Sequence, residues 1–182
     1  KYNSEDKVVL TGTVTNSEGD ASAYWTVRGL DSGIELSDLC VTPVSFALSA
    51  GMTVVQIALQ PFALVEGATY TFYLNSAYTD STSGSASVSV LMNEAPTGGA
   101  LTVPPSEGTA LNTTFTFETA GWSDDEDDYP LEYIFAYYVS FQSDQNIVKS
   151  ASELSYSTAR LGAGKSQDGS LVCIANATDT YG

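Results

Sequence analysis

Five consecutive acidic residues separate Trp122 from an apolar segment that begins at Leu131: Asp124, Asp125, Glu126, Asp127 and Asp128. Ca²⁺ takes about six to eight oxygen ligands, and clustered carboxylates supply them. The run therefore has two interpretations. One is a calcium site. The other, which the sequence favours because the run lacks the glycine-punctuated spacing of an EF-hand loop, is a solvated acidic loop.

Two further oxygen-bearing side chains, Asn93 and Glu94, lie where the strand pattern of the chain is interrupted. If the acidic loop folds back to this junction, Asn93 and Glu94 become additional Ca²⁺ ligands. A cation held in this way would stiffen the joint between two domains. No other cofactor is expected.

The chain contains no histidine, which removes His-dependent serine and cysteine triads and the commonest zinc ligand. The segment Gly162–Ser166 imitates the end of a phosphate-binding loop, but Ala159 stands where that motif needs its first glycine. A strand, rather than a helix, is expected to follow it, so we interpret the segment as a hairpin loop. We expect the protein not to be an enzyme.

Two N-glycosylation sequons occur, at Asn112 and Asn176. Both asparagines lie at an end of an expected strand, where a glycan would be accessible. Cys40 and Cys173 have no metal-ligand spacing; each is either a small buried residue or a partner for a cysteine elsewhere.

The aromatic residues have two interpretations. They could form a sugar-stacking platform, which would make the chain a carbohydrate-binding module. Trp25, Tyr70, Tyr133 and Phe135 instead fall in phase with the buried faces of their strands, which favours a core role. A row of exposed aromatics on one sheet would favour sugar binding.

The elements that position these residues are strands. Apolar residues recur with period two in most segments, as in Tyr70, Phe72 and Leu74, and turn-forming residues separate the segments. This pattern predicts an all-β chain. The strand from Leu131 is apolar on both faces, which predicts contact with another domain or subunit.

The segment Asn93–Gly99, with Pro96 and two glycines, interrupts the strands. We therefore expect two tandem immunoglobulin- or fibronectin III-like β-sandwiches, residues 1–93 and residues 94–182. The final predicted strand of the second domain corresponds to the last strand but one of the first domain, and only Asp179–Gly182 follow it. The second sandwich is therefore expected to lack its last strand. This predicts that the sequence is a piece of a longer chain.

Several motifs carry a resemblance to a family. The segment Leu64–Phe72 resembles the E–F corner of fibronectin III-like sandwiches, in which the phenol of Tyr70 would bond back to the backbone. The segments Asn93–Gly99, Pro105–Leu111, Phe115–Phe117, Trp122–Asp125, Pro130–Phe135 and Asp179–Gly182 occur in the order seen in receptor-for-egg-jelly (REJ) modules of polycystin-type receptors and protist surface proteins. The resemblance implies an extracellular, non-catalytic, tandemly repeated module. It leaves open a receptor or a surface fibre.

Charge limits the partners. The net charge is −16 and the pI about 4.1, so neither nucleic acid nor an anionic membrane surface is an expected ligand. No apolar run is long enough to span a bilayer. We expect a spacer, adhesion or assembly element at the cell surface. Its partners would be neighbouring modules, other surface or fibre subunits, or glycans.

Overall fold

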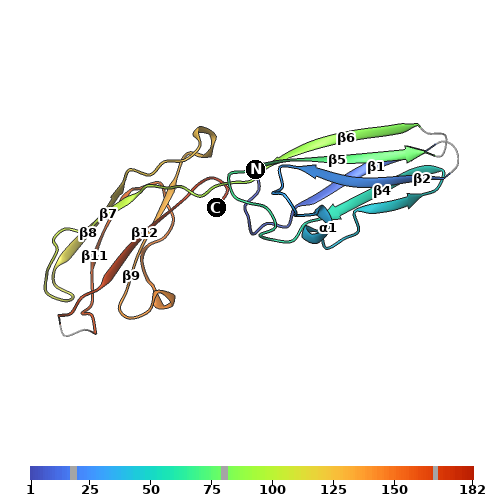
Figure 1. Cartoon of the computed structure of the whole chain (residues 1–182). Helices are drawn as coiled ribbons and strands as arrows, with labels where there is room; N and C mark the ends of the chain where they lie inside the picture. Colours follow the sequence, from blue (N-terminus) through green and yellow to red (C-terminus); the bar gives the residue numbers. More distant parts are fainter. Residues whose placement is uncertain (17–19, 79–81, 166–167) are drawn as a thin grey trace. The chain divides into compact units, whose positions relative to one another are not determined.

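The computed structural model describes residues 1–16, 20–78, 82–165 and 168–182. The chain divides into two compact units, Lys1–Glu94 and Ala95–Gly182, called unit 1 and unit 2 below (Figure 1). In the described residues, no helix has the length and hydrophobicity to cross a membrane.

Unit 1 is built from two antiparallel sheets. One has the strand order β3-β2-β5-β6, and the other pairs β1 with β4 (Figure 1). The elements are β1 (Val9–Asn16), β2 (Ala21–Arg28), α1 (Leu36–Leu39), β3 (Ser45–Leu48), β4 (Gly51–Ala58), β5 (Thr69–Tyr78) and β6 (Ser83–Leu91).

Side chains from both sheets fill the core of unit 1, whose cluster contains sixteen buried apolar residues in the described part of the chain. Strand β5 alternates between buried and less buried positions, and Tyr70, Phe72 and Leu74 face inward. Gly12 on β1 lets the Trp25 ring approach, because a Cβ at this position would lie 3.2 Å from Trp25 Cζ2 and still closer to Leu74. The period-two pattern therefore builds this core as expected.

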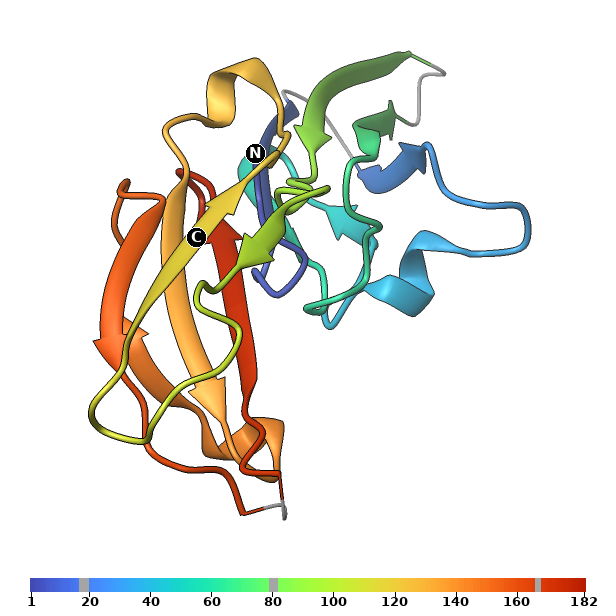
Figure 2. The ribbon, with the colours of Figure 1, turned by 90° about the vertical axis from the view of Figure 1, so that its left-hand side faces the viewer.

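Unit 2 also consists of two antiparallel sheets, with the orders β11-β8-β7 and β10-β9-β12. Its elements are β7 (Ala100–Thr102), β8 (Thr114–Ala120), η1 (Glu126–Asp128), β9 (Glu132–Tyr138), η2 (Gln142–Asp144), β10 (Asn146–Lys149), β11 (Tyr156–Arg160) and β12 (Val172–Thr178). Strands β9 and β12 lie side by side along their whole length (orange and red in Figure 2).

The core of unit 2 is much smaller. Among the residues that the structure describes, its cluster contains three buried apolar residues, Phe117, Phe135 and Leu161, surrounded by ten that are only partly buried. The rings of Phe117 and Phe135 pack at 5.8 Å between centroids. The Lys149 ammonium lies 5.2 Å from the Phe135 ring, and desolvation lowers the pKa of this lysine.

The prediction of an all-β sandwich-type fold is confirmed. The prediction of a hairpin at Gly162–Ser166 is wrong. This segment belongs to the connection between β11 and β12, which lie in different sheets, so it crosses between sheets. Residue 166 itself lies outside the described residues.

Candidate metal centre

The acidic run folds into a loop that turns one carboxylate inward. A single 3-10 turn, η1, is closed by a 3.1 Å bond from the Asp128 N–H to the Asp125 carbonyl. Asp128 is 0% exposed, whereas Asp125, Glu126 and Asp127 face the solvent. The run therefore separates into an inner residue and three outer ones.

Asp124 begins the loop and is partly buried. Its backbone N–H donates to the Tyr129 phenol oxygen at 3.2 Å, and its Oδ1 accepts the Asp125 N–H at 2.8 Å. These bonds orient the Asp124 carboxylate within the loop.

The third member of the cluster comes from the far end of the sequence. Asp179 follows β12 directly, and the β12–β9 ladder ends at the pair Thr178 and Glu132, next to the acidic loop. The Thr180 N–H donates to the Asp128 carbonyl at 3.2 Å. Asp179 Oδ1 accepts backbone N–H groups from Tyr181 at 2.7 Å and Gly182 at 3.1 Å. Asp179 is 6% exposed.

One carboxylate oxygen from each of Asp124, Asp128 and Asp179 lies within 4.8 Å of the others. Desolvation and mutual repulsion both disfavour three adjacent carboxylates. For this reason buried carboxylates are normally paired with a positive charge or coordinate a metal. Ca²⁺–oxygen distances are about 2.3–2.6 Å, so one ion could touch three oxygens with this spacing. The arrangement supplies three anionic oxygen ligands for a hard cation.

The predicted ligands fall into three groups. Asp124 and Asp128 join the cluster; Asp125, Glu126 and Asp127 are exposed and outside it. Asn93 and Glu94 belong to unit 1, where the Asn93 N–H donates to the Tyr2 carbonyl at 2.7 Å and the Glu94 carboxylate lies against Gly67. Their role as ligands stays a prediction.

Sequence reasoning missed Asp179 as a ligand. The residue is separated from the acidic run by about fifty positions, and only the antiparallel pairing of β9 with β12 brings them together. Only the pairing and register of the strand before Asp179 with the strand after the acidic run could have revealed this residue as a ligand.

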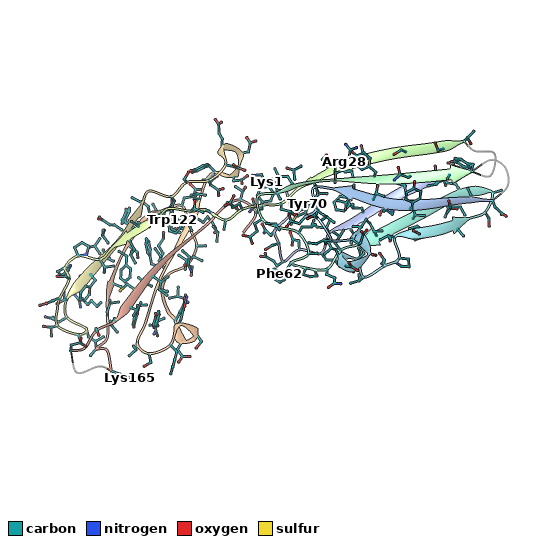
Figure 3. The ribbon with its side chains drawn as sticks, viewed as in Figure 1. Lys1, Arg28, Phe62, Tyr70, Trp122 and Lys165 are labelled. Carbon is teal, nitrogen blue, oxygen red and sulfur yellow. The ribbon has the colours of Figure 1, made fainter. Side chains whose placement is uncertain are left out.

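Trp122 is a structural residue of unit 2. Its indole packs on Gly99, where a Cβ would collide with the ring, and its Nε1–H donates to Thr119 Oγ1 at 2.8 Å (Figure 3). Thr119 Oγ1 in turn donates to the Ala100 carbonyl at 2.9 Å. This chain of bonds fixes Trp122 where the acidic loop begins.

The prediction that four aromatic residues lie in the core agrees with the burial of Trp25, Tyr70 and Phe135. The fourth residue, Tyr133, is half-buried. The exposed aromatic residues that lie in described strands are Tyr24 on β2 and Tyr156 on β11, in different units. In the part of the chain that the structure describes, no strand carries a row of exposed aromatic rings.

Both sequon asparagines are exposed. Asn112 lies in the turn before β8, and Asn176 lies on β12. Cys40 and Cys173 are free, half-buried thiols in different units, and burial raises the pKa of both.

The fibronectin-like corner is present in unit 1. The Val65 N–H donates to the phenol oxygen of Tyr70 at 3.0 Å, and Leu64 and Tyr70 are both buried (Figure 3). The side chain thus closes the turn into β5.

Two solved structures illustrate the weak likeness to known folds. A chain of the chaperone–tip adhesin complex of CFA/I fimbriae biogenesis is 14% identical with a TM-score of 0.36, covering 100% of this chain and 81% of that chain. The CupB2 chaperone of Pseudomonas aeruginosa is 12% identical with a TM-score of 0.32, covering 96% of this chain and 95% of that chain. Similarity this low does not establish a shared fold.

A search of the curated proteins gave no match to this chain. The REJ domain family, in contrast, matches residues 1–182, which is the whole sequence. The ordered sequence motifs and the two all-β units agree with this match. The chain belongs to the REJ domain family.

Proposed function

We propose that this chain is a non-catalytic, extracellular module of a larger cell-surface protein, in which it acts as a spacer and assembly element. The observation that carries this proposal is the REJ match over all 182 residues. The absence of histidine, the net charge of −16 and the exposed sequons at Asn112 and Asn176 support a non-catalytic role outside the cell. The partners would be adjoining modules and other surface or fibre subunits.

The surface location is tested on intact cells of the source with a membrane-impermeant amine reagent. Lys165 is exposed in the connection between β11 and β12, so we expect its labelling without permeabilisation. The control is a cytoplasmic protein, whose lysines should react only after permeabilisation. Labelling of Lys165 only in permeabilised cells would contradict the proposal.

We also propose that Asp124, Asp128 and Asp179 bind Ca²⁺. The supporting observation is the approach of their oxygens to within 4.8 Å while two of the residues are almost fully buried. The cation would hold the acidic loop to the end of β12. It would therefore stiffen one end of unit 2 in the calcium-rich exterior.

The experiment follows thermal unfolding through Trp122 with and without Ca²⁺. Sites in extracellular modules bind with a Kd of about 10⁻⁴–10⁻³ M, so ~10 mM Ca²⁺ should stabilise the native state by about 1.4 kcal/mol or more. Asp179→Asn keeps the oxygen that accepts the two backbone N–H groups but loses the charge. We expect this variant to be no less stable than the parent without Ca²⁺, and to lose the stabilisation by Ca²⁺.

The matched control is Asp127→Asn, because Asp127 is exposed and lies outside the cluster. This variant should retain the full response to Ca²⁺. A parent protein whose unfolding is unchanged by millimolar Ca²⁺ would eliminate the site, and so would an equal loss of response in both variants.

A further inference from the structure

The outer face of the β10-β9-β12 sheet is apolar. Inward side chains of this sheet, such as Phe135 and Ala175, belong to the core cluster, so the alternate residues of each strand face away from the core. At one end of the face these outward residues are Glu132 and Thr178; along the rest they are Ile134, Ala136, Tyr138, Ile147, Val172, Ile174 and Asn176. Six of these seven are apolar, whereas the outer face of an antiparallel sheet is usually polar.

Cross-strand pairing joins these residues into one patch, through the pairs Val172–Tyr138, Ile174–Ala136, Asn176–Ile134 and Ile147–Ala136. Paired side chains lie on the same face of a sheet and contact each other. Ala136, at the centre, is 1% exposed, but Ile147 is 58% and Val172 is 47% exposed. Contiguous exposed patches of this kind mark surfaces that another group covers.

The corresponding face of unit 1 is polar. Strand β2 pairs with β5 as β9 pairs with β12, and the outward residues of β2 and β5 include Tyr24, Thr26, Arg28, Thr71, Tyr73 and Asn75. Asn75 Nδ2 donates to Thr26 Oγ1 at 3.1 Å, and Asn75 Oδ1 accepts from Ser85 Oγ at 3.1 Å. The face of unit 1 is thus suited to water, whereas that of unit 2 requires a cover.

The apolar patch contains an attachment point for a cover. Asn176 begins one of the two N-glycosylation sequons, and its side chain is exposed on this face. Ile134 lies directly opposite Asn176, at about 5 Å between Cβ atoms, and Ile174 lies two residues away on the same strand, at about 7 Å. The first sugar rings on Asn176 would therefore reach both isoleucines.

We infer that Asn176 carries an N-linked glycan whose first sugars cover the apolar outer face of β9 and β12, the orange and red strands in Figure 2. The inference rests on the extracellular location proposed above, because the glycan is added in the secretory pathway. The C–H and N-acetyl methyl groups of the sugars pack on Ile134 and Ile174, while the sugar hydroxyls face water. The glycan keeps this face soluble and blocks other sheets from stacking on it.

The modification is a transfer from a lipid-linked oligosaccharide diphosphate. Asn176 Nδ2 forms a bond to C1 of the first N-acetylglucosamine while the bond from C1 to the diphosphate oxygen breaks. The lipid diphosphate leaves with the bonding electrons, and a base of the transferase takes the amide proton. In the folded unit the ladder with β9 holds Asn176 and Thr178, so the transfer precedes the pairing of β12.

A second copy of this chain is a poorer cover for the patch. Unit 2 contains twelve Asp and Glu against three Lys and Arg, so two such units repel each other. The core sugars of an N-linked glycan are uncharged and escape this repulsion. A bulky glycan on Asn176 also leaves no room for a flat sheet on the same face.

Occupancy is measured on the protein isolated from its source cells. Peptide N-glycosidase in heavy-oxygen water converts a glycosylated asparagine to labelled aspartate, which mass spectrometry locates. We expect the label at Asn176. Label at Asn112 alone would overturn the inference and leave the extracellular location standing. Label at neither site would also overturn the inference, and the labelling of Lys165 then decides the location separately.

Coverage is measured on the full chain secreted from a eukaryotic host, with occupancy of Asn176 confirmed in the same way. The variant is Asn176→Gln and the matched control is Asn112→Gln, because Asn112 lies in the turn before β8 and away from this sheet. The readout is the binding of a neutral polarity-sensitive dye. A glycan that covers about 60 Å² of apolar surface weakens this binding about tenfold. Asn176→Gln should therefore bind the dye about tenfold more tightly than the parent, and Asn112→Gln as the parent does.

Further variants locate the bound dye. Thr178→Val removes the sequon but keeps Asn176, and should reproduce the gain. Ile174→Thr added to Asn176→Gln should lower dye binding again, whereas Val54→Thr, exposed on β4 of unit 1, should not. Trp122 fluorescence confirms that each variant is folded.

Equal dye binding by the glycosylated parent and Asn176→Gln would overturn the inference, and so would equal gains in Asn176→Gln and Asn112→Gln. Native protein that excludes the dye while Asn176 is unmodified would assign the face to another domain or subunit instead.

Discussion

At the scale of residues, one hydrogen bond in unit 1 has a consequence for stability that can be measured. Tyr70 is 3% exposed, and its phenol oxygen accepts the Val65 N–H at 3.0 Å. Tyr70→Phe keeps the ring but leaves this donor without its acceptor. We expect a loss of about 1–3 kcal/mol in the free energy of unfolding, measured with urea. The control is Tyr73→Phe on the same strand, whose side chain is only partly buried; its loss should stay below about 0.5 kcal/mol. Equal losses would show that the bond does not stabilise the corner.

The residues also show what sequence can reveal about a site. The acidic run could be recognised from the sequence alone, and it contains two of the three clustered carboxylates, Asp124 and Asp128. Which side chains turn inward was not visible, because this depends on the single turn of η1. Asp179 was missed as a ligand because its proximity depends on long-range strand pairing, which a local pattern does not specify. The placement of Trp122 was not predicted for a similar reason, because it depends on contact with Gly99.

At the scale of elements, long alternating segments were predictable and short ones were not. Strand β5 follows the expected period, because one of its faces lies in the core. The four-residue elements β3, β10 and α1 were not anticipated, since so few residues hold too little of any pattern. Tertiary pairing defines them, as the contacts of β3 with β2 and of β10 with β9 illustrate.

The apolar second face of strand β9 can be buried within its own unit or by another domain or subunit. Its second face carries Ile134, Ala136 and Tyr138, and this apolarity predicted contact with another domain or subunit. In unit 2, Ala136 is 1% exposed, and it pairs with Ile147 on one side and Ile174 on the other. Neighbouring strands therefore bury part of this face within the unit itself. Contact of the remaining surface with another subunit stays a prediction.

At the scale of the whole molecule, the unequal cores of the two units predict the order in which they unfold. Among the described residues, the core cluster of unit 1 contains sixteen buried apolar residues and that of unit 2 contains three, so unit 2 gains less free energy from apolar burial. We expect the urea midpoint of unit 2 to lie about 1 M or more below that of unit 1.

The two tryptophans allow this order to be measured in the full chain, because Trp25 lies in unit 1 and Trp122 in unit 2. Trp122→Phe leaves Trp25 as the reporter of an intact unit 1, and Trp25→Phe leaves Trp122 as the reporter of an intact unit 2. Each unit is thus followed in the variant that preserves its own core. If both reporters change at one urea concentration, the two units unfold as one, and the difference between their cores does not set the order.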